Sequence, residues 1–304
     1  MKNYMELIKV TEEAAIAASS WVGSGNKLEA DRVATDAMQK RLSRIEGFTG
    51  HIRIGEGKKD ESYGLFKGDM ISGPFGTRWN EQYDIAVDPI DGTTPTVTSG
   101  PDAMSVMAVA DKDSMYETDE FYMLKLAVSG YVAKRTNLYL STPLPELCKQ
   151  VAAVLDKPTD KLTVCILNRP RHEEWIKQMR SIGVRIKLIQ DCDISGAITA
   201  ADGGNIDMQF GVGGAPEAVI TAAAVKCLDG FFLSQVWDKD VGLKGDVFTH
   251  DDLVRSHCYF SATGITDGSL LKGVRWTSHG PVTHSLFMRS SSGTVRWIET
   301  RHGN

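Results

Sequence analysis

The sequence predicts an α/β protein, and three observations support this prediction. Its 304 residues are enough for about two domains with substantial cores. Hydrophobic residues make up 42% and charged residues 24% of the chain, as in ordinary soluble globular proteins. From about residue 145 onward, helical and strand patterns alternate, which is typical of crossover units in a mainly parallel sheet.

The first half of the chain begins with two expected helices. Apolar residues recur at helical spacing from Met5 to Ala18, and glycines at 23 and 25 end the segment. A second helical pattern runs from about 29 to 45. Strands are then expected at 51–54, 83–87 and 104–110. The glycine-rich, charged segment 55–61 is predicted to be a loop.

The second half alternates more regularly. Helices are expected at 145–157, 172–182, 194–201 and 216–228. Strands are expected at 162–168, 184–190 and 205–211, then at 259–263, with a closing hairpin at 283–289 and 294–300. We therefore expect two domains, an N-terminal α+β domain of residues 1–144 and a C-terminal α/β domain of residues 145–304.

Composition excludes several classes of function. A net charge of −5 and a pI near 5.8 argue against a nucleic-acid partner. No apolar run is long enough to span a membrane, and the N-terminus is not of the signal-peptide type. The five cysteines are scattered without a C-x-x-C pair, so neither a disulfide framework nor a zinc ribbon is expected. These features predict a cytoplasmic protein with no membrane partner.

The strongest chemical signal is the run DIAVDPIDGT at 84–93. Asp88 and Asp91 are three residues apart where a buried strand is expected to break at Pro89, and Gly92 allows a tight turn beside them. Two carboxylates in one small space are tolerated when a divalent cation lies between them, and Mg²⁺ and Mn²⁺ prefer such oxygen ligands. The alternative is a turn in which both aspartates only cap a helix.

A second acidic segment follows the strand expected at 51–54. Glu56 stands between two glycines, and Asp60 lies four residues beyond it. Alone this is an ordinary solvated loop, but beside the first pair it supplies ligands for a two-metal site that activates water and neutralises a leaving oxygen. Asp31, on the second expected helix, is a further candidate, with a solvated surface acid as the alternative.

A glycine-rich turn joins the strand at 205–211 to the helix at 216–228. The amides at Gly213 and Gly214 precede Pro216 and Glu217 at the start of the helix, a place suited to a phosphate or an oxyanion. The alternative is a plain turn in which Glu217 complements the helix dipole.

Two arginines follow the strand expected at 162–168. Arg169 and Arg171 flank Pro170, which is expected to hold the segment extended, and arginine forks bind phosphate bidentately. Surface ion pairs are the alternative. Asp191 and Asp193 follow the next strand and are expected at the same rim, where they could accept sugar hydroxyls.

The cysteines and histidines carry no recognisable catalytic spacing. Cys192 has no base or metal partner in the sequence, and the seven histidines form no H-E-x-x-H motif. We therefore expect no nucleophilic catalysis by a cysteine, and we expect the histidines to be ordinary polar or half-buried residues.

Together these motifs resemble the class II fructose-1,6-bisphosphatases, the bacterial type that includes the cyanobacterial fructose-1,6-/sedoheptulose-1,7-bisphosphatases. The D-P-I-D-G-T core is shared with the wider inositol-monophosphatase-like, metal-dependent sugar phosphatase superfamily. The family resemblance extends over nearly the whole chain, in the blocks IGEGKKDE, DIAVDPIDGTT, FYMLKL, NRPRHEEWI, QDCDIS, GVGGAPEAVI and THSLFMRSSSGTVRWIETRH.

The resemblance implies a layered α-β-α-β-α sugar-phosphatase fold with two sheets. It implies a metal-dependent phosphatase that hydrolyses the 1-phosphate of fructose 1,6-bisphosphate, and of sedoheptulose 1,7-bisphosphate in the cyanobacterial members, in gluconeogenesis or the Calvin cycle. The implied cofactor is Mg²⁺ or Mn²⁺, two or more per active site, and the implied assembly is a homo-oligomer, a dimer or a tetramer. Most metal ligands would fall in the N-terminal domain and the sugar-phosphate contacts in the C-terminal one.

The resemblance also assigns roles to individual residues. The implied metal ligands are Asp31, Glu56, Asp88, Asp91 and Glu217. Thr93 and Asp60 would orient and deprotonate the attacking water. The implied substrate-binding residues are Asp91, Gly92, Thr93, Tyr122, Arg169, Pro170, Arg171, Asp191, Asp193 and Gly214.

The chain departs from the family pattern at four places. One is the stretch 62–67, which replaces a more apolar family pattern. Asp91 stands where the family has Glu, Cys192 stands where it has Gly, and the segment between 230 and 260 is shorter than usual. Two other functions therefore stay open. One is an inositol- or nucleotide-phosphate phosphatase of the same superfamily, and the other is a catalytically weakened sugar-phosphate sensor.

Overall fold

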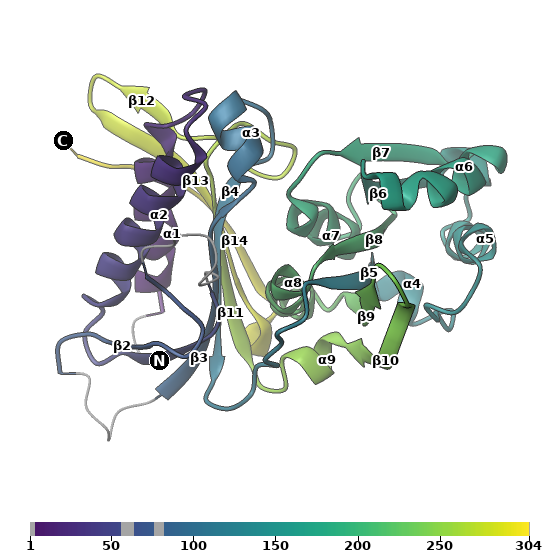
Figure 1. The fold of residues 1–304 in the computed structure, drawn as a ribbon, viewed down its shortest axis with the longest axis horizontal. Coiled ribbons are helices and arrows are strands. Elements are labelled where there is room, and N and C mark those ends of the chain that lie inside the picture. The colour runs from purple at the N-terminus through teal and green to yellow at the C-terminus, as the bar shows by residue number, and fades with distance from the viewer. Residues whose placement is uncertain (1–3, 56–63, 76–81, 304) are drawn as a thin grey trace. The chain divides into compact units, whose positions relative to one another are not determined.

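The computed structural model describes residues 4–55, 64–75 and 82–303 (Figure 1). Its contacts divide the chain into two compact units. Unit 1 comprises residues 1–117 together with 256–304, and unit 2 comprises 118–255. This division differs from the expected boundary at 144/145, because the last strands of the chain pair within the sheet of the first ones. A sequential split cannot capture a chain that returns to its first sheet.

Unit 1 is built on a mixed sheet in which eight strands are described, in the order β12-β13-β11-β4-β3-β1-β2, with β14 on β13. Among the described strands of this sheet, only β1 and β3 pair in parallel. The strands are β1 (Thr49–Ile54), β2 (Met70–Ser72), β3 (Gln82–Asp91), β4 (Met104–Asp111), β11 (Cys258–Gly264), β12 (Arg275–Thr277), β13 (Gly280–Arg289) and β14 (Thr294–Arg301). The helices are α1 (Glu6–Ser19), α2 (Lys27–Leu42), α3 (Thr93–Thr98) and the short 3₁₀ turn η3 (Ser290–Ser292).

Helices α1 and α2 lie together on one face of this sheet (Figure 1). Leu7, Val10 and Ala14 of α1 are buried against strand residues that include Ile85 and Phe287. The helical spacing of these apolar residues in the sequence explains why one side of α1 faces the core. The sequence therefore predicted both helices within a few residues of their observed bounds.

Strand β3 differs from its prediction at the C-terminal end. It does not break at Pro89 but continues to Asp91. Its pairing with β4 passes from Asp88–Val106 to Asp91–Met104, so β3 has one residue more than β4 over this stretch. This extra residue makes a β-bulge, which accommodates a proline that has no N–H to donate to the ladder.

Unit 2 is built on a mixed sheet in which six strands are described, in the order β10-β9-β5-β8-β6-β7. The strands are β5 (Tyr122–Val128), β6 (Thr163–Leu167), β7 (Arg185–Ile189), β8 (Met208–Gly214), β9 (Phe231–Asp238) and β10 (Gly242–Thr249). The helices are α4 (Gly130–Ala133), α5 (Leu144–Val154), α6 (Glu173–Ser181), α7 (Asp193–Ala201), α8 (Ala215–Cys227) and α9 (His250–Leu253), with 3₁₀ turns η1 (Thr159–Lys161) and η2 (Pro170–His172).

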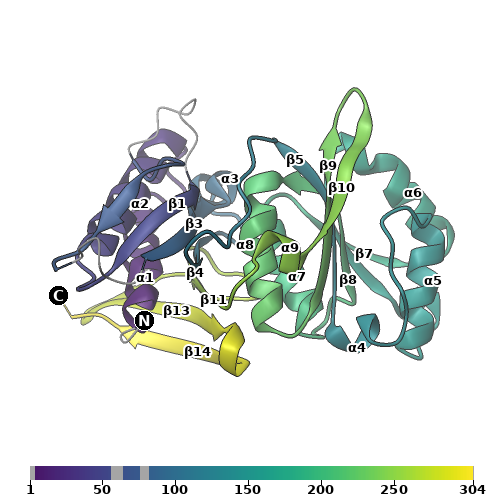
Figure 2. The same cartoon turned by 90° about the horizontal axis from the view of Figure 1, so that it is seen from below.

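Helices cover both faces of the sheet in unit 2 (Figure 2). Val164 and Ile166 of β6 join the core that α5 and α6 cover, whereas the alternating residues Cys165 and Leu167 face Ala200 of α7. Alternation along the strand sends neighbours to opposite faces. The helices and strands predicted from 145 to 228 are all present, and the α/β class with two sheets is confirmed.

The expectation of a mainly parallel sheet in the second half is wrong. Strand β6 pairs in parallel with β7 and β8, but β5 pairs antiparallel with both β8 and β9, and β9 with β10. The antiparallel part comes from β5, β9 and β10, which the pattern did not predict. None of the described helices has the length and apolar character of a membrane span.

Candidate active-site residues in each unit

The turn after β3 is set by a glycine. Gly92 has φ 100° and ψ 55°, a left-handed conformation that other residues rarely adopt. Its carbonyl accepts a hydrogen bond from Thr96 N at 3.0 Å, which opens α3. On the other side of the turn, Asp88 Oδ1 accepts one from Ile90 N at 3.0 Å. The chain therefore turns at Gly92, between Asp91 at the end of β3 and Thr93 at the start of α3. Asp91 is buried.

Helix α2 brings two further residues to this turn. Thr93 Oγ1 donates a hydrogen bond of 2.9 Å to Asp31 Oδ1, although the two residues are 62 positions apart in the sequence. One helical turn earlier, Lys27 Nζ donates to Thr94 Oγ1 at 2.8 Å. The i, i+4 spacing places Lys27 and Asp31 on one face of α2. Asp31 and Thr93 therefore lie together, as a shared site requires.

The second acidic segment contains the predicted residues Glu56 and Asp60. Glu56 and Asp60 lie outside the described residues. Their predicted roles as a metal ligand and as a partner of Thr93 stay predictions.

In unit 2, the ends of two parallel strands bring a predicted pair together. Arg169 follows β6 and Asp191 follows β7, and Arg169 Nη2 lies 2.8 Å from Asp191 Oδ1. Neighbouring parallel strands have their carboxyl ends at the same edge of the sheet, as the sequence argument assumed. Pro170 does not hold this segment extended, because residues 170–172 form the 3₁₀ turn η2.

Arg171 is held against strand β8. Its Nε and Nη2 both donate to the carbonyl oxygen of Val212, at 3.1 and 2.7 Å. Its guanidinium also lies over the ring of Tyr122, 4.9 Å from the centroid. Burial lowers the pKa of Arg171 from its ordinary value, and the nearby Arg169 acts in the same direction. These contacts fix the orientation of the guanidinium, and its other N–H groups remain to bind a ligand.

Asp193 is neutralised by a lysine inside the unit. Lys125 Nζ on β5 donates to Asp193 Oδ2 at 2.8 Å, and both side chains are buried. A Cβ on Gly213 would stand 2.0 Å from the same Oδ2, so this strand position requires glycine. The pair fixes the start of α7 against β5 and β8.

Glu217, in the first turn of α8, is enclosed at one oxygen. Its Oε2 is shielded from solvent and has no hydrogen-bond partner among the described residues. A Cβ on Gly214 would stand 1.8 Å from this oxygen, so Gly214 leaves the space that the carboxylate occupies. Burial raises the pKa of Glu217, Asp193 adds to the rise, and Lys125 opposes it. A nearby cation would stabilise the charged form of such a carboxylate.

Cys192 departs from ordinary backbone geometry. It has φ 64° and ψ 51° at the start of α7, the left-handed region in which glycine is unstrained. Its side chain is buried. The backbone therefore keeps a glycine-type conformation at a position where this chain has a cysteine.

No metal centre is complete within the described residues. Among them, no group of three or more His, Cys, Asp or Glu side chains is arranged to hold a metal ion. Asp31 and Thr93 meet in unit 1, and Arg169, Arg171, Asp191, Asp193 and Glu217 lie in unit 2. The sequence reasoning missed Lys125 and His172, although a lysine within the apolar run MLKLAV was a signal for a buried ion pair.

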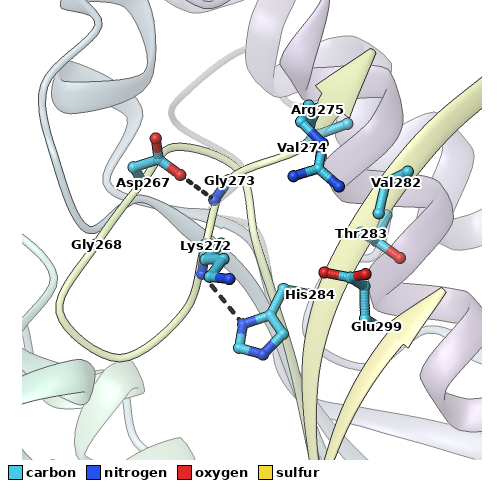
Figure 3. A pocket seen from close by; sticks show the side chains of 10 residues that line it. All are labelled: Asp267, Gly268, Lys272, Gly273, Val274, Arg275, Val282, Thr283, His284 and Glu299. Atoms are coloured by element: carbon cyan, nitrogen blue, oxygen red, sulfur yellow. Dashed lines mark hydrogen bonds between the residues drawn. The ribbon is translucent and has the colours of Figure 1, made fainter. Parts of the chain in front are cut away.

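A cavity of about 570 Å³ lies elsewhere in unit 1, between the loop 267–274 and strands β12, β13 and β14 (Figure 3). Lys272 N donates to His284 Nδ1 at 3.2 Å across it, and Gly273 N donates to Asp267 Oδ1 at 2.9 Å. Its lining contains both acidic and basic side chains. None of the predicted site residues lines this cavity.

Comparisons with known proteins identify relatives. The family model described as "Bacterial fructose-1,6-bisphosphatase, glpX-encoded" matches residues 1–302. The "D-fructose 1,6-bisphosphatase class 2/sedoheptulose 1,7-bisphosphatase" proteins of Synechococcus elongatus and Microcystis aeruginosa are each 36% identical to this chain over 333 residues. Each alignment covers 98% of this chain and 95% of the relative.

Proposed function

Because this chain belongs to the glpX-type family of bacterial fructose-1,6-bisphosphatases, we propose that it hydrolyses the 1-phosphate of fructose 1,6-bisphosphate to give fructose 6-phosphate and phosphate. The names of its relatives suggest sedoheptulose 1,7-bisphosphate as a second substrate. The observation that carries the proposal is the hydrogen bond between Thr93 and Asp31, which joins the predicted water-orienting residue to a predicted metal ligand.

Metal-dependent phosphatase chemistry is general in this family. We propose Mg²⁺ or Mn²⁺, two or more per active site, with the ligands that the family resemblance implies, Asp31, Glu56, Asp88, Asp91 and Glu217. The enclosed Oε2 of Glu217 fits this role because a hard cation would satisfy it. When bound, the cations lower the pKa of a coordinated water and neutralise charge on the phosphate and leaving oxygen.

The hydroxyl of Thr93 has a defined direction in this arrangement. Its proton is donated to Asp31, so the lone pairs of Oγ1 are left to accept a hydrogen bond from an attacking water. Asp60 is the proposed base that takes the proton of that water. The backbone of Asp91, Gly92 and Thr93 is the proposed contact for the scissile phosphate, and Gly92 allows that close approach.

Unit 2 supplies the proposed recognition of the rest of the substrate. The paired arginines Arg169 and Arg171 favour a substrate with a second phosphate over one with a single phosphate. Tyr122 supports the Arg171 guanidinium from below. Asp191 and Asp193 are the proposed acceptors for sugar hydroxyls, with Pro170 and Gly214 shaping the segments around them. The family resemblance further supports a cytoplasmic homo-oligomer, a dimer or a tetramer, which sedimentation measurements would test.

The deciding experiment is a substrate panel. Phosphate release is measured from fructose 1,6-bisphosphate, sedoheptulose 1,7-bisphosphate, inositol 1-phosphate and a nucleotide 3′-phosphate, each with Mg²⁺ and with Mn²⁺. We expect turnover of a sugar bisphosphate that Thr93→Ala abolishes. Thr98→Ala, an exposed threonine on the same helix, is the matched control and should keep full activity.

Other outcomes assign a different function. Preferential turnover of inositol 1-phosphate or the nucleotide would make the protein another phosphatase of the superfamily. Calorimetric binding of fructose 1,6-bisphosphate without turnover of any substrate would favour a sugar-phosphate sensor.

A further inference from the structure

Strand β8 has an edge that β6 leaves unpaired after its first residues. The two strands pair only at Met208 and Gln209 of β8, and β6 ends at Leu167. On the opposite edge, β8 pairs with β5 from Gln209 to Gly214. The N–H and C=O of Val212 therefore both point to an edge where no strand of the described chain follows.

Two consecutive residues of η2, Arg171 and His172, bind the backbone of β8 where β6 does not pair with it. Val212 N donates to His172 Nε2 at 2.8 Å, and Val212 O accepts two hydrogen bonds from Arg171, at 3.1 and 2.7 Å. The other ring nitrogen, His172 Nδ1, lies 2.7 Å from the carbonyl oxygen of Leu167 at the end of β6. The imidazole thus connects the end of β6 to β8.

These partners fix the tautomer of His172. A backbone N–H can only donate, so Nε2 must be the acceptor, and Nδ1 carries the proton that it donates to Leu167 O. The ring is fully buried and stacks on Trp175 with centroids 5.5 Å apart. Burial lowers the pKa of His172, with Arg171 and Arg169 acting in the same direction and Asp193 opposing them. His172 is therefore neutral at neutral pH, with both nitrogens engaged.

We propose that His172 is a positioning residue for substrate binding, because it holds the backbone N–H of Val212, the residue whose carbonyl anchors the Arg171 guanidinium. This inference rests on the proposed role of Arg171 as a phosphate ligand. It goes beyond that role by assigning a function to a histidine that touches no substrate. Without the Nε2 acceptor, the N–H of Val212 loses its hydrogen-bond partner, so the backbone of Val212 is held less firmly and Arg171 loses a fixed acceptor for its fork.

Two conservative substitutions separate the two hydrogen bonds of the ring. In His172→Gln, Oε1 reaches the place of Nε2 and keeps the bond from Val212 N. In His172→Asn, Nδ2 occupies the place of Nδ1 and keeps only the bond to Leu167 O. Each variant loses one buried hydrogen bond, so the two should lose similar thermal stability, while only the Asn variant releases Val212.

The measurement is the Kd for fructose 1,6-bisphosphate by calorimetry, with EDTA so that no turnover occurs. We expect His172→Asn to weaken binding about tenfold, the scale of one buried hydrogen bond, and His172→Gln to stay within about twofold of the parent. In an Arg171→Ala background, His172→Asn should add no further loss, because its effect passes through Arg171. His257→Asn and Arg180→Ala, both at exposed positions, are the controls.

Three results would overturn the inference. Equal losses in the Asn and Gln variants would show a general structural role, and losses that multiply with Arg171→Ala would show that His172 acts independently of Arg171. Unchanged binding in Arg171→Ala alone would remove the role of Arg171, and the inference with it. Failure of this inference can be distinguished from failure of the proposed function. A parent protein that binds the bisphosphate but releases no phosphate still allows the Kd values of the His172 and Arg171 variants to be compared.

Discussion

The predicted site residues of unit 1 lie mostly in one short segment, whereas those of unit 2 come from four separate ones. In unit 1, Asp88, Asp91 and Thr93 follow one another around a single turn, and α2 adds Asp31 through one hydrogen bond. In unit 2, the residues follow β6 and β7 or lie on β5, β8 and α8. The positions of these residues depend on contacts between side chains of different segments, such as the ion pair of Arg169 with Asp191.

The difference suggests a division of labour. Unit 1 gathers carboxylates and a hydroxyl, the groups that bind cations and orient water. Unit 2 gathers two arginines, Arg171 held by a carbonyl and an aromatic ring and Arg169 paired with Asp191, and arginine forks suit phosphate. We therefore expect substitutions in unit 1 to affect kcat and substitutions at the arginines of unit 2 to affect KM.

The largest effect is expected at Asp88. Asp88→Asn removes one carboxylate charge without changing the size of the side chain, so the kcat for fructose 1,6-bisphosphate should fall about 10³-fold or more, the scale of a lost electrostatic contact in a transition state. Steady-state kinetics with Mg²⁺ checks this. The control is Asp36→Asn, a half-buried aspartate of α2 whose carboxylate pairs with Lys40. Retention of more than a tenth of the activity would remove Asp88 from the site.

Breaking the buried ion pair of unit 2 should cost stability. Lys125→Met leaves Asp193 buried without its cation, so the free energy of unfolding should fall by about 3–5 kcal/mol. Lys134→Met, which breaks an exposed pair with Asp229, should cost less than about 1 kcal/mol. Denaturant titration measures both, and equal losses would contradict the distinction.

Glu217 should combine lost activity with gained stability. Glu217→Gln removes a buried charge, so the melting temperature with EDTA should rise by about 2–4 °C, while metal-dependent activity is lost. The raised pKa of Glu217 means that the folded parent loses stability as pH rises from 4.5 through the folded value, and the variant should lack this slope. Glu173→Gln, at an exposed position, is the control. A lower melting temperature would mean that the carboxylate is satisfied without a cation.

A smaller effect is expected from the titration of His172. Its folded pKa is lowered below 6.5, so only the unfolded chain gains a proton as pH falls through 6.5, and stability drops. His172→Gln removes this group, so between pH 6.5 and the folded pKa its free energy of unfolding should fall less steeply than that of the parent, by up to about 1.4 kcal/mol per pH unit. Equal slopes in urea titrations at each pH would show that His172 is protonated in the folded protein.

The sequence predicted motifs and most helices and strands, but it did not predict contacts between segments that are far apart in the chain. The motif DIAVDPIDGT and the alternating pattern from 145 to 228 led to the right fold class, and the family match confirms the resemblance. The strand pattern could not show the bulge at Pro89. A proline, which lacks an N–H, ends some strands, whereas other strands continue past it through a β-bulge.

The sequence also could not show which side chains brace the arginines. His172 follows Arg171 directly, but its function depends on strand β6 ending before β8 does, which only the three-dimensional pairing reveals. Lys125 and Asp193 are 68 positions apart. The placement of β11, β13 and β14 in the first sheet likewise depends on long-range pairing.

The most direct test of the division between the units is a comparison of Thr93→Ala and Arg171→Ala in one kinetic series with fructose 1,6-bisphosphate and Mg²⁺. We expect Thr93→Ala to lower kcat strongly with little change in KM, and Arg171→Ala to raise KM with a much smaller change in kcat. A raised KM alone in Thr93→Ala, or a lowered kcat alone in Arg171→Ala, would contradict the account.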